Sequence, residues 1–150
     1  MPLPDLREAG ALHDLGVIRT DQLPDLAARW LAADVVDSEA VRLLAGHARQ
    51  DPEAIERLMR DALHEAQVEP LQGPSAAREV VLEHVSARWR LDHDTRGAVA
   101  LLARLGESRP DLHLDEFIGL DDEWTGGWGR LAREVEAAAE TTLSRSLPGS

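Results

Sequence analysis

Apolar residues recur along this chain at the spacing of α-helices, with short polar breaks between them. The segment 51–66 shows the pattern most clearly, because Asp51 can cap a helix whose first position is Pro52. Its apolar residues fall at i, i+3, i+4, i+7 and i+8, so they share one helix face. They are Ile55, Leu58, Met59, Ala62 and Leu63. Acid–base pairs four residues apart, Glu53/Arg57 and Glu56/Arg60, are expected on the solvated face.

Comparable stripes predict helices that begin near residues 20, 37, 75 and 94, a short helical turn around Phe117 and a final helix over about 128–143. Ser75 is expected to cap one of them and Gly106 to end another. The chain has one Phe and no Tyr, so strand-forming aromatic residues are scarce. The pattern predicts an all-α fold, a compact bundle or short α-superhelix of six or seven helices.

A possible duplication divides the chain. The segment 68–75, "VEPLQGPS", is the strongest break, and we expect a loop there within a single domain spanning 1–150. "ARW" occurs at 28–30 and again at 87–89, followed by "AVRLLA" at 40–45 and "AVALLA" at 98–103. Half-repeats over 20–69 and 75–125 would bury Trp30 and Trp89 in equivalent places; the alternative is coincidence in an Ala-, Leu- and Arg-rich chain. The tail 144–150 is expected to fray.

Two segments carry a resemblance. "LPDLAARWLAADVVDSEAVRLLAG" (23–46) and "LHLDEFIGLDDEW" (112–124) resemble parts of small helical proteins widespread in high-GC actinobacteria, a family without an assigned function. The resemblance would cover most of residues 20–140 and rests on apolar spacing and the box F-x-G-L-x-D-E-W. It implies an autonomous helical domain and brings no catalytic residues.

The net charge is −12, from 28 acidic and 16 basic residues, and every basic residue is arginine. Such a charge repels phosphate backbones and anionic lipid, so it disfavours nucleic-acid and membrane-surface binding and suits a basic protein partner. Solubility alone is the other interpretation. The N-terminus lacks the basic region and apolar run of a secretory signal, no window is apolar enough for a membrane span, and cysteine is absent. We therefore expect a soluble cytoplasmic protein.

Two segments contain residues that could bind a metal ion. "DHDTRG" (92–97) begins like a calcium loop, but Arg96 and Ala103 stand where its oxygen ligands belong, so it indicates a helix N-terminus. In "DLHLD", Asp111, His113 and Asp115 alternate and could face one metal ion; a polar loop before the next helix is the preferred interpretation. No nucleophile motif or phosphate loop occurs. No catalytic residue, cofactor or metal ligand is assigned.

The stretch 114–130, "LDEFIGLDDEWTGGWGR", contains the only Phe and two of the four Trp residues. Phe117 and most of this aromatic surface are expected in the core. Trp128 differs because the glycines beside it give no local shelter, and six acidic residues and no arginine lie between positions 111 and 123. Trp128 could instead close the last helix onto the core. The predicted partner-binding residues are Asp115, Glu116, Asp121, Asp122, Glu123 and Trp128.

These patterns favour a non-catalytic, acidic helical domain that binds a protein, such as an immunity or antitoxin-like neutraliser of a basic partner. A structural or accessory subunit of a larger assembly is the alternative, and an enzyme ranks third. A homo-oligomer is left open.

Overall fold

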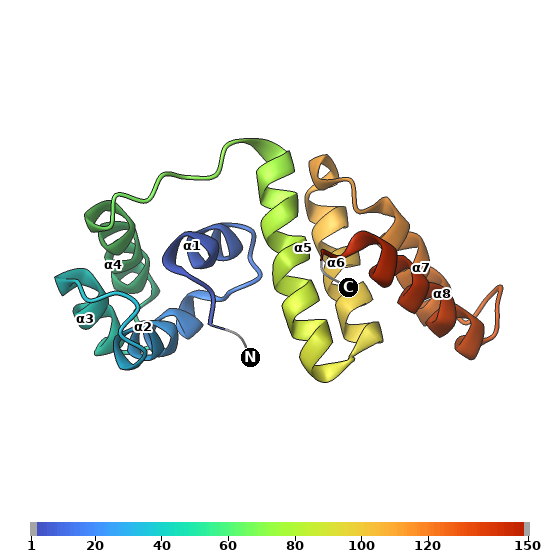
Figure 1. Ribbon diagram of the computed structural model, residues 1–150, viewed down its shortest axis with the longest axis horizontal. Coiled ribbons are helices and arrows are strands. Elements are labelled where there is room, and N and C mark those ends of the chain that lie inside the picture. The colour runs from blue at the N-terminus through green and yellow to red at the C-terminus, as the bar shows by residue number, and fades with distance from the viewer. Residues whose placement is uncertain (1–2, 149–150) are drawn as a thin grey trace. The chain divides into compact units, whose positions relative to one another are not determined.

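The structure is a computed structural model that describes residues 3–148, and these residues form helices joined by loops, with no strand among them (Figure 1). The predicted all-α fold is confirmed. The described chain contains eight α-helices rather than six or seven, and two short 3-10 helices. In order they are α1 (Leu6–Asp14), η1 (Thr20–Gln22), α2 (Leu23–Ala32), α3 (Glu39–Ala45), α4 (Pro52–Glu65), α5 (Gly73–Asp92), α6 (Thr95–Ser108), η2 (Pro110–Leu112), α7 (Asp115–Gly126) and α8 (Ala132–Ser146).

The helix that the sequence pattern did not predict is α1. Its N-terminus is capped by Asp5, whose side chain accepts a hydrogen bond from the backbone N–H of Glu8. It has nine residues, and its buried stripe contains only two large side chains, Leu6 and Leu12. So few large apolar residues give only a weak helical pattern in the sequence, although all of them are buried in the structure.

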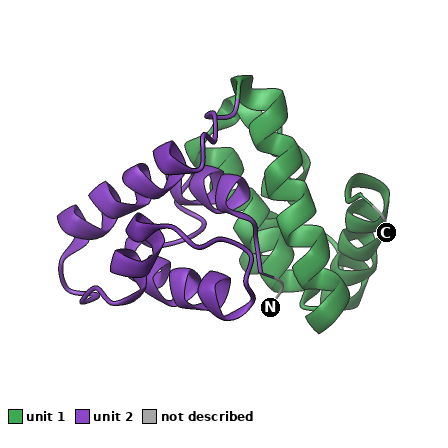
Figure 2. Ribbon diagram, turned by 60° about the vertical axis from the view of Figure 1, so that its left-hand side comes forward, with its two compact units in different colours: residues 1–2, 72–150 green, residues 3–71 purple. Residues whose placement is uncertain are grey.

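The described chain divides into two compact units, residues 3–71 and residues 72–148, coloured separately in Figure 2. We call them the N-terminal and C-terminal units. Their boundary, between Leu71 and Gln72, falls inside the break of Pro and Gly residues at 68–75.

The N-terminal unit packs α3 against α2 and α4, and α1 against α4. Trp30 of α2 is fully buried, and its indole N–H donates a hydrogen bond to the backbone oxygen of Pro4 at 2.7 Å. This bond satisfies the only polar atom of the side chain, so the indole adds its apolar area to the core without a desolvation cost. Ser38 caps α3, and Asp51 caps α4 as predicted.

The C-terminal unit packs α6 against α7 and α8, with α5 alongside α6. Trp89 of α5 is buried and donates its indole N–H to the hydroxyl of Thr95 at 3.1 Å. The tail expected to fray from residue 144 instead continues α8 to Ser146. Leu147 after it is buried, and the backbone oxygen of Pro148 accepts a bond from the Ser86 hydroxyl at 2.7 Å. The last two residues lie outside the described part.

Several predicted helix boundaries are wrong. The final helix, expected from about residue 128, begins at Ala132, and the short turn expected around Phe117 is the 12-residue helix α7. The helix expected to start at Ser75 begins two residues earlier, at Gly73, with Gln72 as its N-cap. Gly106, expected to end α6, lies inside that helix and is buried. A Cβ atom at Gly106 would lie 3.0 Å from the Cβ of Leu114 and 3.1 Å from the Cδ1 of Ile118. The residue is therefore a glycine because α6 and the start of α7 pack too closely for a side chain, and not because a helix ends there.

The half-repeats stay a prediction. Both Trp30 and Trp89 are buried, which the duplication requires. The helices that carry the tryptophans differ in length, however, with 10 residues in α2 and 20 in α5. The two indoles also donate to different kinds of acceptor, a backbone oxygen and a hydroxyl.

Replacing Gly106 tests the close approach of α6 and α7. We expect Gly106→Ala to lower the free energy of unfolding by about 1 kcal/mol, because overpacking costs roughly 1–3 kcal/mol and exceeds the gain in helix propensity. Gly119→Ala in α7 is the matched control, since a Cβ there meets nothing within 4 Å. It should raise the free energy of unfolding by about 0.5–1 kcal/mol. Urea unfolding of both variants measures the difference, and equal stabilisation by the two changes would contradict close packing at Gly106.

Candidate functional site

The predicted partner-binding residues lie on α7 and on the turn that follows it. We call residues 127–131 the α7–α8 turn. Two glycines in it have positive φ angles, +66° at Gly127 and +83° at Gly129. Residues with a Cβ rarely adopt this left-handed conformation, and a glycine just after a helix is a common way to end it. The "TGGWG" sequence therefore builds a sharp reversal between α7 and α8.

The turn is fastened to α7 by an ion pair between Glu123 and Arg130. The Arg130 side chain donates to both oxygens of the Glu123 carboxylate, from Nε and Nη2 at 2.8 Å each. The backbone N–H of Arg130 donates to the same carboxylate at 3.0 Å. Gly129 permits this approach, because a Cβ there would lie 3.0 Å from Glu123 Oε1. Such two-pronged pairs fix geometry as well as charge.

These bonds lower the pKa of Glu123. The guanidinium hydrogen bonds from Arg130, followed by the bond from its backbone N–H, bring the pKa of the Glu123 carboxyl from 4.5 to about 2. Glu123 is therefore ionised at neutral pH, but its charge is already matched by an arginine of the same chain. These bonds give Glu123 a role in holding the turn, and its part in partner binding stays a prediction.

Trp128 projects from this turn into solvent. Its side chain is 64% exposed, so it does not close the last helix onto the core. One edge of the indole lies over Gly126, where a Cβ would come within 2.5 Å of Trp128 Cδ1. Leu131, three residues further on, is 59% exposed. The turn thus exposes two large apolar side chains within four residues. Single apolar residues are common on protein surfaces, but two so near in sequence are more typical of an interaction site.

The five predicted acidic residues do not act as one strip. Glu116 is bound to Arg145 of α8, so like Glu123 it is matched internally. Asp115 and Asp122 are exposed and Asp121 is half-buried. In residues 3–148, no arginine or histidine forms an ion pair with any of these three aspartates. The carboxylates available to a partner are therefore those of Asp115, Asp121 and Asp122.

Three arginines that matter at this site were missed by the sequence reasoning. Arg130 and Arg145 neutralise two of the predicted acidic residues, and the Arg96 guanidinium lies 5.5 Å from the ring centre of Trp124. The Arg96 contact is a cation–π interaction between α6 and α7. Only Arg130 left a usable signal, since a glycine-rich reversal returns the chain toward the end of α7.

In the two segments that could have held a metal ion, the aspartates bond to their own neighbours in the chain. Asp94 accepts a hydrogen bond from the N–H of Gly97 at the start of α6, and Asp92 accepts one from the N–H of Asp94. Asp111 forms an ion pair with Arg109, whose guanidinium lowers the pKa of the Asp111 carboxyl. Within the described residues, no three His, Asp or Glu side chains form a group that could hold a metal ion.

In comparisons with protein-family models, curated proteins and solved structures, no match to this chain was found. No described helix combines the length and apolar character needed to span a bilayer. The function must therefore be inferred from the residues of the chain itself.

The Glu123–Arg130 ion pair predicts a pH dependence of stability. Because the pKa of Glu123 is lower in the folded state, the pair stabilises the fold fully above about pH 4.5. That stabilisation is lost as the pH falls toward about 2, where the folded-state carboxyl takes up its proton.

We therefore expect Glu123→Gln to be less stable than the unchanged protein at pH 7, and the difference to shrink steadily below pH 4.5. Urea unfolding at a series of pH values measures it. Asp122→Asn is the control, since Asp122 is an exposed neighbour without an ion pair in the described chain. A Glu123→Gln difference that stays constant from pH 7 to 2.5 would show that its charge has no part in holding the turn.

Proposed function

We propose that this protein is a non-catalytic protein-binding domain whose anchor is Trp128. One observation carries the proposal: an indole that is 64% exposed sits on a turn that an ion pair and two positive-φ glycines hold in place. Exposed tryptophans are costly to keep in water and are enriched among the residues that dominate protein–protein affinity. Leu131, in the same turn, is a second exposed apolar side chain.

The fixed turn supports this role because it reduces the cost of binding. A flexible loop would lose conformational freedom when its tryptophan entered a partner's pocket, and that loss would subtract from the affinity. Here Arg130, next but one to Trp128, is already bonded to α7 through three hydrogen bonds. The anchor is therefore largely preorganised before a partner arrives.

Charge supports a basic partner. Asp115, Asp121 and Asp122 carry no ion pair in the described chain, and the whole protein has a net charge of −12. Such a negative field raises the association rate with a positively charged protein. The apolar anchor governs the dissociation rate of the complex. An immunity or antitoxin-like protein that neutralises a basic partner fits this combination.

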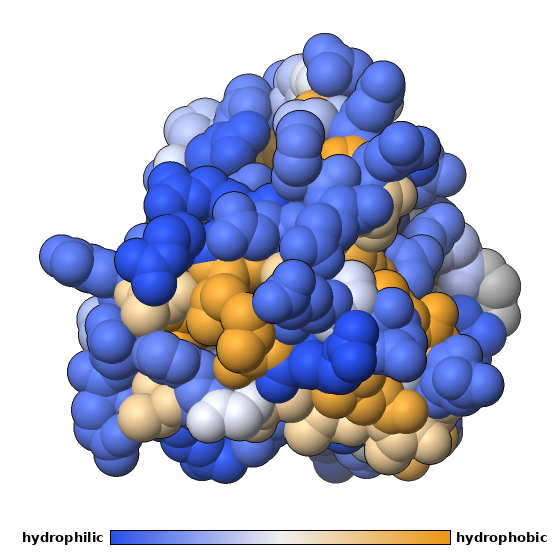
Figure 3. Space-filling view, turned by 90° about the vertical axis from the view of Figure 1, so that its left-hand side faces the viewer, coloured by the Kyte–Doolittle hydropathy of each residue, from blue (hydrophilic) through white to orange (hydrophobic). Residues whose placement is uncertain are grey.

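A structural or accessory subunit of a larger assembly is the second candidate. Figure 3 shows apolar residues interrupting the polar surface on the side of the molecule where α3 lies. The large exposed apolar residues of the N-terminal unit are Val35 and Leu43, each 55% exposed. An assembly that covers surfaces on both units would account for them together with Trp128.

Truncating the tryptophan tests the anchor. The protein is used as bait in extracts of its native host, the retained protein is identified, and its dissociation from purified variants is measured. Trp128→Ala should speed dissociation by roughly 30-fold, equivalent to about 2 kcal/mol, because it removes a central apolar contact. Its melting temperature should change little, since the side chain packs mainly on Gly126.

Leu91→Ala is the matched control, a 66% exposed apolar residue of the same unit outside the turn. It should leave binding unchanged. If the partner dissociates from Trp128→Ala as slowly as from the unchanged protein, Trp128 is not the anchor. Retention of a defined set of several subunits, insensitive to Trp128→Ala, would favour the assembly alternative.

The free aspartates should act on the association rate. We expect Asp121→Asn/Asp122→Asn to slow association with a basic partner several-fold and to flatten its dependence on salt, because exposed charges act through long-range attraction. Dissociation should be nearly unchanged. Stopped-flow measurements between about 20 mM and 300 mM salt separate the two rates. An unchanged salt slope would mean that the negative charge serves solubility alone.

A further inference from the structure

The N-terminal unit contains an open groove between α1 and α4. Its volume is about 550 Å³, and residues of the loop 15–19 and the start of η1 also line it. The range typical of ligand sites is roughly 300–1,000 Å³, so the groove is large enough for a small molecule or a short peptide. Its lining is neither purely apolar nor of one charge.

Two helices supply the walls. Gly10, His13 and Asp14 of α1 lie at i, i+3 and i+4 and therefore share a face. Glu56 and Arg60 lie one turn apart on the facing side of α4. Gly10 allows the helices to meet, since a Cβ there would lie 3.3 Å from the methyl carbons of Leu63. Part of the floor is apolar, with Met59 and Ile18 both buried.

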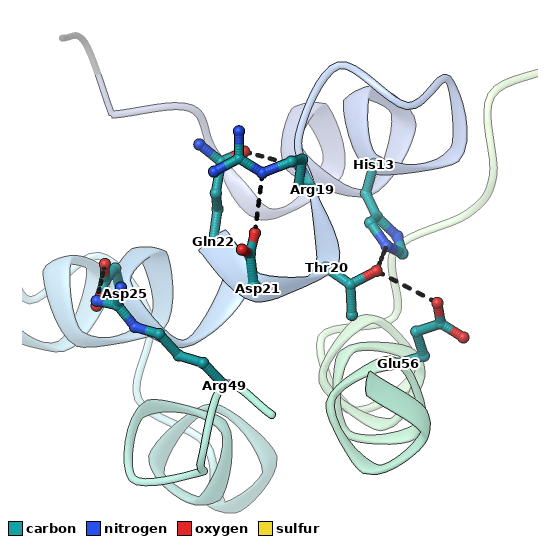
Figure 4. A network of polar contacts seen from close by, with 8 residues as sticks. All are labelled: His13, Arg19, Thr20, Asp21, Gln22, Asp25, Arg49 and Glu56. Carbon is teal, nitrogen blue, oxygen red and sulfur yellow. Dashed lines mark hydrogen bonds and ion pairs between the residues drawn. The ribbon is translucent and has the colours of Figure 1, made fainter. Parts of the chain in front are cut away.

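A chain of hydrogen bonds fixes one charge at the rim. The Thr20 hydroxyl donates to Glu56 Oε1 at 3.3 Å, and the Nε2 atom of His13 lies 3.1 Å from the Thr20 oxygen (Figure 4). Because Thr20 gives its proton to Glu56, His13 must be the donor in the other bond. The chain aims the Glu56 carboxylate at the groove and leaves its second oxygen without a partner in the described residues.

The opposite charge is also available. Glu56 and Arg60 have the spacing of a helix-surface ion pair, yet no such pair forms. Within residues 3–148, neither Arg60 nor Asp14 has a hydrogen bond or ion pair. Arg19 at the end of the groove is by contrast occupied by Asp21 at 3.1 Å. The walls therefore hold one unmatched guanidinium and two carboxylates with free oxygens.

We propose that this groove binds a short peptide with free ends, or a similar molecule that carries both an ammonium and a carboxylate group. Glu56 and Asp14 take the ammonium group, and Arg60 takes the carboxylate through a two-pronged bond. Small apolar side chains of the ligand rest on Met59 and Ile18. A ligand of a single charge would meet at least one like charge in the walls, which disfavours it.

The test uses the tripeptide Ala-Leu-Ala as probe, with the full-length protein and detection by amide NMR shifts and calorimetry. We expect saturable shifts confined to α1, the loop 15–19 and α4, with a dissociation constant on the order of a millimolar. Acetylating the amino end, or amidating the carboxyl end, should each weaken binding about tenfold or more, because each removes one charge-assisted bond. Binding that tolerates both caps would overturn the proposal.

Variants on one helix supply the control. Glu56→Gln and Arg60→Gln should each reduce affinity about tenfold, with Glu56→Gln acting on the ammonium end and Arg60→Gln on the carboxylate end. After Arg60→Gln, amidating the peptide should make no further difference. Glu53→Gln and Arg57→Gln change the same residue types on exposed positions of α4 outside the groove, and should bind normally. The site would be rejected if the Glu53 and Arg57 variants lost as much peptide affinity as the Glu56 and Arg60 variants. It would also be rejected if the unchanged protein bound no peptide at 10 mM, on the order of ten times the expected dissociation constant.

The test does not depend on the partner-binding proposal, because the probe contacts the N-terminal unit and Trp128 lies in the other. Trp128→Ala should bind the tripeptide like the unchanged protein. Loss of peptide binding alone leaves the anchor intact, and loss of the protein partner alone leaves the groove intact.

Discussion

The close approach of α6 and α7 positions the turn that carries Trp128. Gly106 has no side chain to separate these helices, so the start of α7 rests directly on α6 at Leu114 and Ile118. Further along, the Arg96–Trp124 contact joins the same two helices. With α7 fixed at both points, Glu123 is held where it can bind Arg130 and so fix the turn. The turn that exposes Trp128 is thus attached to a helix whose position depends on close packing at Gly106, earlier in the chain.

Features set by neighbouring residues could be predicted from the sequence. The cap at Asp51 could be predicted because it depends only on a side chain reaching a backbone N–H three residues ahead, as Ser38 and Asp94 also do in the structure. The helices predicted from the apolar stripes are also present, because the spacing of apolar residues along one helix face is likewise a local property of the sequence. Gly106 was misread because a glycine after an apolar stripe has the same local appearance whether it ends a helix or permits a close contact. Only the position of α7, a tertiary fact, separates the two cases.

The acidic site shows the same limit in its electrostatics. The sequence shows six acidic residues between positions 111 and 123 without a basic one, which suggests a continuous negative surface. Folding brings Arg109, Arg130 and Arg145 to Asp111, Glu123 and Glu116, so half of that charge is matched within the chain. Trp128 could be singled out in advance because its glycine neighbours offer no cover. The exposure of its side chain could not be predicted, because it depends on the geometry of the α7–α8 turn, which the bonds between Arg130 and Glu123 hold.

In the groove of the N-terminal unit, interactions of less than about 1 kcal/mol determine which charged side chains lack an ion-pair partner. A Glu and an Arg four residues apart on an exposed helix attract one another by only roughly 0.3–0.5 kcal/mol, so the spacing of Glu56 and Arg60 does not ensure that they pair. One hydrogen bond from Thr20, itself held by His13, is a comparable contribution and redirects the carboxylate toward the groove. Arg60 is then left with water as its partner. A ligand that offers a carboxylate to Arg60 and an ammonium to Glu56 breaks no existing ion pair. It replaces water at both groups, and for this reason two weakly held charges form a better site than a strong ion pair would.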